Sequence, residues 1–217
     1  MDINKASISL PSGPHKAGLL SPIRELHQQH QDEILGHLLE LNEEDRRLRF
    51  GTLTSDEVLR SYVEHIDFEN DAIFASFDNQ LKLIGLAHLA YLTTSETRPD
   101  TAEFGVSVLP NGRGLGIGTA LLKRAAIHAR NTSINTLFVH CLANNRAMMK
   151  LASKAGMEVE YAYGDADAYL MLPPANVGSI VEEANSEQWA GFDYALKQHL
   201  KRSHAAWKWL FSKTKCV

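Results

Sequence analysis

The residues best suited to bind a ligand lie in "NGRGLGIGTALLKR", residues 111–124. Glycine occupies every second position from Gly112 to Gly118, with Arg113 inside the run and an apolar helical pattern after it. Glycine lets the backbone approach a ligand closely. The start of a helix offers unpaired N–H groups and a partial positive charge. Because arginine adds a full charge, we expect this stretch to bind an anion, and a pyrophosphate suits it best.

Two common nucleotide-binding motifs do not fit these glycines. A Walker A loop needs Lys-Ser or Lys-Thr after its last glycine, and neither follows here. A Rossmann fingerprint, Gly-x-Gly-x-x-Gly, would end at Ile117 if it began at Gly112, and at Thr119 if it began at Gly114. The acidic residue that binds the ribose is missing as well. What remains is an Arg-x-x-Gly-x-Gly pattern that begins at Arg113.

The distribution of charge supports an anion site more clearly than the net charge of −4 does. Residues 104–157 contain no Asp or Glu but seven Lys or Arg. These are Arg113, Lys123, Arg124, Arg130, Arg146, Lys150 and Lys154. Such a local excess of positive charge attracts anions. Residues 158–196 then carry eight acids and no Lys or Arg. This acidic band, with Asp165 and Asp167 on a predicted turn, either receives a cationic acceptor or is a solvated surface.

Composition limits the class of protein. A chain of 217 residues with 44% hydrophobic residues fits one domain with extensions. No apolar stretch approaches the roughly 18 residues of a membrane span, and the N-terminus lacks the pattern of a secretory signal. The two cysteines, Cys141 and Cys216, form neither a disulfide framework nor a metal-ligand spacing. We therefore expect a cytoplasmic protein with no membrane span and no metal.

Hydrophobic periodicity predicts a mixed α/β protein. The expected order is strand, two helices, three strands, helix, strand, helix, two strands and a helical tail. One helix is expected across residues 27–50 and the next across 54–66. Residues 1–17 are rich in Ser, Pro and Gly, which predicts a disordered N-terminal segment. Residues 18–174 are expected to form the main domain, and residues 175–217 a C-terminal helical extension.

Two motifs together resemble a known family. An Arg-x-x-Gly-x-Gly pattern after a strand that ends at Val108 is similar to the acetyl-coenzyme A signature of the GNAT (GCN-five-related) N-acetyltransferases. "NNRAMMKLASKAGM" resembles the second motif of the family, Asn-x-x-Ala-x-x-Leu-Tyr-x-Lys-x-Gly-Phe. The resemblance covers about residues 102–172. It implies that residues 18–174 form a GNAT acetyltransferase domain, with a splayed, mostly antiparallel central sheet flanked by helices and acetyl-CoA wedged between two strands.

The resemblance also implies which residues hold acetyl-CoA. The backbone of Val106 and Val108 would hold the pantetheine arm and the thioester carbonyl, and Asn145 would contact the same arm. Arg113 and the N–H groups of the glycine stretch would hold the pyrophosphate. Those N–H groups belong to Gly114, Leu115, Gly116, Ile117, Gly118 and Thr119. Lysines and arginines of the basic block would meet the adenosine 3′-phosphate.

Direct acetyl transfer needs a base, because an amine with a pKa of about 10 must lose a proton before it attacks the thioester. We assign this role to Glu103, five residues before Val108 and the last acid before the acid-free block. "AEFGVSV" is similar to the protein-lysine acetyltransferases, including bacterial Pat-type enzymes, in which a Glu at this place acts as base. "LNEEDRRLRF" resembles the same enzymes. The alternative is a solvated carboxylate at a strand start. His88 and His140, on predicted strands, are interpreted as packing residues.

The acid for the leaving thiolate is missing from its usual place. Many members of the family use the tyrosine of the second motif, and that position is Ala152 here. Tyr161, Tyr163 or Tyr169 could substitute for it. Coenzyme A thiolate, with a pKa not far above that of cysteine, can also leave without help.

The sequence thus predicts an acetyl-CoA-dependent N-acetyltransferase that acts on a primary amine, with protein lysine slightly favoured over a small amine or polyamine. The missing tyrosine leaves a second hypothesis, a coenzyme A-binding sensor or regulatory module without catalysis. The basic tail matches no nucleic-acid-binding motif, so we expect no nucleic-acid partner. An apolar stripe across residues 189–210 predicts that the tail packs on its own domain or on a second subunit, as in a homodimer.

Overall fold

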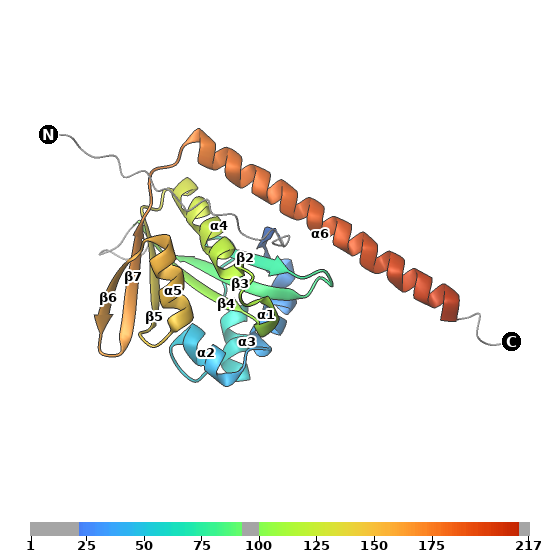
Figure 1. Ribbon diagram of the computed structural model, residues 1–217, viewed down its shortest axis with the longest axis horizontal. Helices are drawn as coiled ribbons and strands as arrows, with labels where there is room; N and C mark the ends of the chain where they lie inside the picture. Colours follow the sequence, from blue (N-terminus) through green and yellow to red (C-terminus); the bar gives the residue numbers. More distant parts are fainter. Residues whose placement is uncertain (1–21, 93–99, 213–217) are drawn as a thin grey trace.

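The computed structural model describes residues 22–92 and 100–212, with side chains as far as residue 201 (Figure 1). The predicted disordered segment, residues 1–17, lies outside the described residues. One seven-stranded sheet, in the order β1-β2-β3-β4-β5-β7-β6, organises the domain. Its strands are β1 (Ile23–Leu26), β2 (Ala72–Phe77), β3 (Leu83–Tyr91), β4 (Thr101–Val108), β5 (Thr136–Leu142), β6 (Glu158–Ala162) and β7 (Asp165–Met171).

All neighbouring strands pair in the antiparallel sense except β4 and β5, which are parallel. A parallel pair needs a crossover connection, and a helix supplies it here. The predicted mixed, mostly antiparallel sheet is therefore confirmed. The helices are α1 (Gln31–Leu39), α2 (Glu43–Phe50), α3 (Asp56–Glu64), α4 (Ile117–Asn131), α5 (Arg146–Ala155) and α6 (Val177–Ser212), with short 3-10 turns η1 (Gln28–His30) and η2 (Pro110–Gly112).

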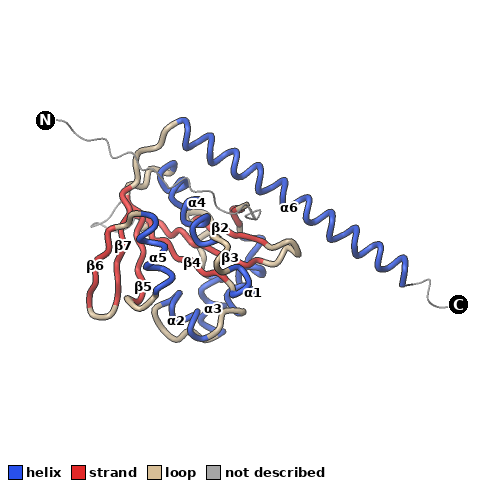
Figure 2. The backbone as a smooth tube through the Cα atoms, in the orientation of Figure 1, coloured by secondary structure: helices blue, strands red, loops and turns tan. Residues whose placement is uncertain are grey.

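The two faces of the sheet bury two separate apolar cores, each covered by helices (Figure 2). Strand side chains alternate between the faces. Phe74 and Phe104 pack with Leu121 of α4 in one core, whereas Ile73 packs with Leu59 of α3 in the other. This arrangement places the middle strands of the sheet between two helical layers.

The helix predicted across residues 27–50 is wrong as a single element. After η1, α1 ends at Leu39 and α2 begins at Glu43. The backbone of Asn42 is extended, and its side-chain oxygen accepts a hydrogen bond of 2.8 Å from the N–H of Asp45. Asparagine at this position stabilises a new helix start and competes with continued helix. The break lets α2 turn towards β4 and β5.

The tail is one continuous helix of 36 residues, α6. It runs along the domain and projects beyond it towards the C-terminus (Figure 1). Its inner side packs on β1 and α4, with Ala190 buried. Phe77 and Tyr194 meet edge to face, with ring centroids 5.1 Å apart, and Arg24 lies over the Tyr194 ring.

Candidate active site

The central sheet splits between β4 and β5. Their ladder pairs only Thr101 to Glu103 with Thr136 to Phe138. Beyond that point β4 stays paired with β3 as far as Val108, and β5 stays paired with β7 as far as Leu142. The two strands therefore diverge after Glu103 and Phe138. Residues 104–108 of β4, which include Val106 and Val108, line the split with an edge that β5 does not cover.

The glycine stretch closes the far end of β4. Arg113 follows η2 and donates a hydrogen bond of 3.2 Å from Nε to the carbonyl of Val108. Gly114 and Gly116 have φ angles of 76° and 82°, a region in which a residue with a side chain is strained. Gly116 is the N-cap of α4. The two glycines thus shape the chain so that the N-terminus of α4 follows directly on β4.

The other residues of the glycine stretch differ in how far they are buried. Ile117 is buried and fixes the first residue of α4 in the core. Leu115 is 59% exposed. Gly118 and Thr119 occupy the first turn of α4, where N–H groups lack partners within the helix. The structure thus brings the predicted pyrophosphate residues together at one helix start.

Asn145 lies on the other side of the split, at the start of α5. Its side-chain oxygen accepts a hydrogen bond of 3.0 Å from the N–H of Met148, and its amide nitrogen donates to the carbonyl of Leu48, 3.2 Å away. The side chain is buried. Asn145 therefore caps α5 and ties this helix to α2.

Helix α2 bridges the two diverging strands. Asp45 forms an ion pair of 2.6 Å with Arg113 at the β4 side, while Leu48 accepts the bond from Asn145 at the β5 side. Between them, the guanidinium of Arg49 lies so close to Gly105 that a Cβ there would collide with it. The sequence motifs did not reveal this role of α2. Nothing in its periodicity marks Asp45 or Arg49 as neighbours of a strand more than 50 residues later.

Glu103 lies at the vertex of the split and is half-buried. Cross-strand partners share a face of the sheet, so Glu103 and its partners Ala90 and Phe138 point to one side. Gly105 and its partner His88 point to the same side. Glu103 therefore shares its face of the sheet with Arg49, which lies against Gly105.

A chain of hydrogen bonds borders this face. Arg49 donates to the Tyr62 hydroxyl (3.3 Å), Tyr62 contacts Nδ1 of His88 (2.5 Å), and Nε2 of His88 contacts Asp71 (2.9 Å). Burial raises the pKa of Tyr62, so its hydroxyl keeps its proton. The two ring nitrogens of His88 thus each have a polar partner, the Tyr62 hydroxyl and the Asp71 carboxylate. His88 is thus a partly buried histidine whose ring packs against Tyr62 and whose ring nitrogens are satisfied by neighbours, as the packing interpretation expected.

The three tyrosines that could protonate the thiolate differ in exposure and in their place on the sheet. Ala152 is completely buried in the core. Tyr163 is fully exposed on the β6–β7 turn, and Tyr161 is 66% exposed. Tyr169 pairs with Phe138 across β5 and β7, with ring centroids 5.2 Å apart. Because Phe138 is also the partner of Glu103, Tyr169 is the tyrosine of these three that shares the Glu103 face next to the split.

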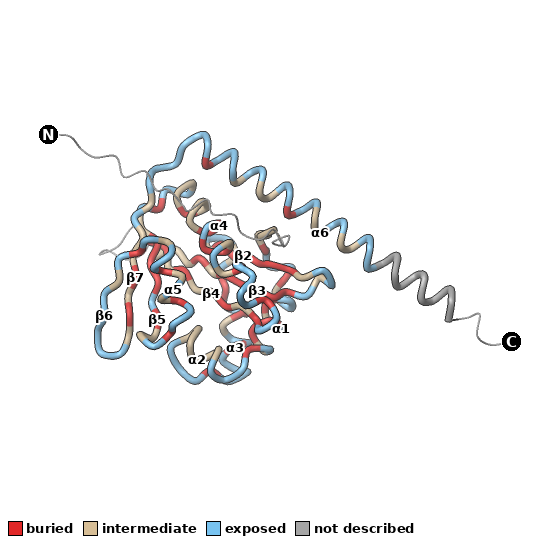
Figure 3. The backbone as a smooth tube through the Cα atoms, in the orientation of Figure 1, coloured by how far each residue is buried: buried red, intermediate tan, exposed pale blue. Residues whose placement is uncertain are grey.

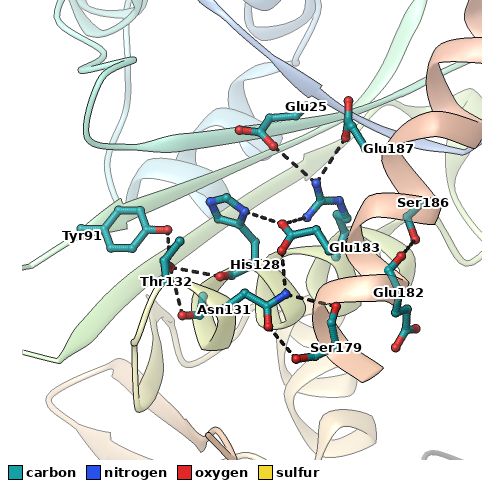
Figure 4. A network of polar contacts seen from close by, with 12 residues as sticks. Glu25, Tyr91, His128, Asn131, Thr132, Ser179, Glu182, Glu183, Ser186 and Glu187 are labelled. Atoms are coloured by element: carbon teal, nitrogen blue, oxygen red, sulfur yellow. Dashed lines mark hydrogen bonds and ion pairs between the residues drawn. The ribbon is translucent and has the colours of Figure 1, made fainter. Parts of the chain in front are cut away.

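Two of the bases within residues 104–157 stabilise the fold through ion pairs. Arg124 is buried and donates to Glu25, Glu183 and Glu187 at 3.4, 2.7 and 3.2 Å (Figure 4). Lys123 pairs with Glu182 at 2.7 Å. Burial would raise the pKa of Glu183, but hydrogen bonds from Asn131, His128 and Arg124 outweigh it and lower the pKa. These two bases of the block therefore bind acids within the chain, chiefly those of α6.

The comparisons with known proteins agree with this geometry. The sequence profile of the Acetyltransferase (GNAT) family matches residues 35–157, which is more than half of the chain. The chain belongs to the GNAT acetyltransferase family. It is thus an acetyl-CoA-dependent GNAT N-acetyltransferase.

Solved GNAT structures share the fold at low sequence identity. The GNAT domain of S. lividans PAT is 19% identical, with a TM-score of 0.59, over 69% of this chain and 89% of that one. A ribosomal-protein-alanine N-acetyltransferase from Brucella melitensis is 20% identical (TM-score 0.55; 69% and 99%). A spermidine N-acetyltransferase from Vibrio cholerae, in complex with CoA and spermine, is 21% identical (TM-score 0.52; 69% and 94%).

The described part of this GNAT acetyltransferase was also searched for membrane-spanning helices and metal sites. None of its helices is long and apolar enough to cross a membrane. Among the same residues, no group of three or more His, Cys, Asp or Glu side chains is placed to hold a metal ion.

Proposed function

We propose that this GNAT acetyltransferase moves the acetyl group directly from acetyl-CoA to a primary amine in the split between β4 and β5, with Glu103 as the base. The observation that carries the proposal is the position of Glu103. Glu103 is the last residue of β4 that pairs with β5 before the two strands diverge. The other end of β4 leads into the glycine stretch at the start of α4.

The spacing along β4 suits acetyl-CoA. Five residues separate Glu103 from Val108, which corresponds to about 17 Å of extended strand. The pantetheine arm would run along the uncovered edge, with the backbone of Val106 and Val108 as its partners. The pyrophosphate would bind Arg113 and the N–H groups of residues 114–119 at the start of α4. This arrangement brings the thioester towards Glu103.

The reaction needs one base and one leaving group. The neutral amine nitrogen attacks the thioester carbonyl carbon, a C–N bond forms, and backbone N–H groups hold the oxyanion. The C–S bond then breaks and coenzyme A leaves as a thiolate. Glu103 takes the first proton from the ammonium form of the amine before the attack, and the second proton of the nitrogen balances the one that the thiolate gains. Tyr169, on the same face as Glu103, is the best placed of the three strand tyrosines to protonate the thiolate. The step needs no metal.

For the acceptor, we favour a protein lysine in the cytoplasm, and a small amine or polyamine is the alternative. The similarity of "AEFGVSV" and "LNEEDRRLRF" to protein-lysine acetyltransferases supports the first choice. The acidic hairpin of β6 and β7 supports a cationic acceptor of either kind. Asp167 points to the Glu103 face of the sheet, where it contacts His140 at 2.7 Å.

The test follows labelled acetyl groups from acetyl-CoA in a mixture of purified protein and bacterial lysate. Label in a discrete protein band would support a lysine acceptor, and label only in small molecules would support a metabolite or polyamine. A Gly116→Val variant is the control, because strain at φ 82° should disrupt the loop and abolish both binding and transfer. If acetyl-CoA binds but neither fraction is labelled, the enzyme proposal fails and the sensor is favoured.

A further inference from the structure

Arg49 differs from the other arginines of α2 in its partners. Arg46 pairs with Asp56 at 2.7 Å, and Arg47 pairs with Glu44 at 3.0 Å. Arg49 forms no ion pair with any residue that the structure describes. Figure 3 shows the C-terminal half of α2 at intermediate burial, so the guanidinium is half-buried rather than sealed within the protein. A half-buried cation without a counter-charge is costly unless an anion can reach it.

The guanidinium of Arg49 is nevertheless held in one place. It donates to the Tyr62 hydroxyl at 3.3 Å and lies over the Phe50 ring, 4.9 Å from the ring centroid. Tyr62 is fixed in turn by its contact with His88. Gly105 leaves the room that the guanidinium needs. The bond to Tyr62 uses one N–H donor of the fork, so donors remain for a further partner.

This cation lies beside the proposed base. Gly105, on which Arg49 lies, is two residues from Glu103, and the two positions share one face of the sheet. Two residues of extended strand span about 7 Å. Glu103 and Arg49 thus present a negative and a positive group next to each other, on the face where Glu103 would meet the acceptor. Such a pair of charges complements a molecule that carries an amine and a carboxylate close together.

We propose that Arg49 is a specificity-determining residue that binds a carboxylate of the acceptor. The preferred acceptor is then a primary amine with a carboxylate within roughly 7 Å of the reacting nitrogen. This inference rests on the proposed function, because it takes Glu103 as the group that receives the amine.

The geometry of arginine suits this role. Its planar fork binds a carboxylate through two parallel hydrogen bonds, which fixes the orientation of the bound molecule. Binding at Arg49 would therefore direct the amine towards Glu103. In a protein acceptor the carboxylate belongs to an acidic residue beside the lysine, and in a small acceptor it belongs to an amino acid. A polyamine carries only positive charges, so Arg49 would repel it.

The test compares acceptors that differ in one charge but not in shape. One pair is γ-aminobutyrate and its amide, and the other is a blocked peptide that contains Asp-Lys and its Asn-Lys counterpart. Binding is measured by calorimetry on the full chain in complex with coenzyme A, and transfer is measured as kcat/KM with acetyl-CoA. We expect the carboxylate member of at least one pair to bind and react about tenfold better, the scale of a charge-assisted hydrogen bond. The pair that shows the preference identifies the source of the carboxylate, a free amino acid or a protein.

Variants of α2 and α3 tie the preference to Arg49. Arg49→Gln should reduce it to less than about twofold, because a neutral amide cannot form the charge-assisted bond. Arg47→Gln is the matched control on the same helix and should leave the preference intact. Tyr62→Phe is a second variant, which keeps the charge but removes the bond that holds the guanidinium. It should weaken the preference by about threefold, even if Arg49→Gln fails to fold.

The outcomes separate this inference from the proposed function. Equal affinities and rates within both pairs, or a preference that survives in folded Arg49→Gln, would overturn the role of Arg49. Preferential binding of the carboxylate members without acetyl transfer would support that role and count against the enzyme proposal for these acceptors. If no acceptor binds or reacts, both fail.

Discussion

The guanidinium of Arg49 occupies the place that a Cβ of residue 105 would need, beside Gly105 in the middle of the strand that borders the split. Glycine weakens a strand, so its presence there needs a reason. The reason is steric, because any Cβ would occupy the place of the guanidinium. Arg49 also lies over the Phe50 ring and donates to Tyr62. This contact joins α2 to β4 beside Glu103.

Gly105→Ala should therefore destabilise the protein by about 1 kcal/mol, because the guanidinium of Arg49, the movable end of a flexible side chain, must shift and give up its bond to Tyr62. In an Arg49→Ala background the same change should cost much less, because the clashing group is gone. A double-mutant cycle from urea unfolding measures this coupling, which we expect to be about 0.5–1 kcal/mol. Additive effects of the two changes would contradict the contact.

Glu103→Gln should lower the rate of acetyl transfer by about 100-fold or more, the usual effect of removing a general base. The neutral amide keeps the size of the side chain but cannot take a proton. Acetyl-CoA affinity, measured by calorimetry, should change less than about twofold, because the cofactor residues lie further along β4. An unchanged transfer rate would remove Glu103 as the base.

Asp45 forms an ion pair with Arg113, the arginine that we assign to the pyrophosphate. Since the two side chains form an ion pair of 2.6 Å, the carboxylate competes with the ligand for Arg113. Asp45→Asn should strengthen acetyl-CoA binding by about two- to fivefold, the scale of a partly exposed ion pair. Arg113→Gln should weaken it. Weaker binding by Asp45→Asn, at an unchanged melting temperature, would mean that Asp45 positions Arg113 instead.

His37 should make stability depend on pH. Burial lowers the pKa of His37 to about 4, and the neutral ring donates from Nδ1 to the carbonyl of Leu83 and accepts at Nε2 from Ser107. The folded-state pKa lies below the unfolded value of about 6.5, so the stability is present above pH 6.5 and is lost as the pH falls towards 4.

Between pH 7.5 and pH 5 this group should remove about 2 kcal/mol from the free energy of unfolding. The measurement is urea unfolding at both pH values. His37→Gln is less stable at pH 7.5 but should lose its share of the pH dependence. If the free energy of unfolding changed equally with pH in the two proteins, groups other than His37 would be the cause of the pH dependence.

Arg124 should be essential for the docking of α6. Arg124→Met removes the partner of three carboxylates and should cost about 2 kcal/mol or more, because three partly exposed acids lose the one buried cation that they share. Hydrogen exchange should rise first in residues 177–190. Lys123→Ala, which breaks a half-exposed pair with Glu182, is the control and should cost less than about 1 kcal/mol. Equal costs would contradict the structural role of Arg124.

The local motifs were readable because they depend on neighbours in sequence. Gly114 and Gly116 need left-handed backbone, and Gly156 ends α5 with a φ of 73°. The helix break at Asn42 was also a local signal, since asparagine followed by acids is a helix start. It was overlooked because the apolar period continued through it.

What the sequence by itself determined is the glycine-rich loop between a strand and a helix, the second motif, and thereby the family and its cofactor. Only the tertiary structure decided that β4 and β5 separate after Glu103, that Arg49 lies on Gly105, and that Arg124 binds the acids of α6. The physical reason is range. A helix start or a tight turn is specified by a few adjacent residues, whereas these contacts join segments up to about 100 residues apart, whose pairing depends on how the sheet and its two helical layers pack.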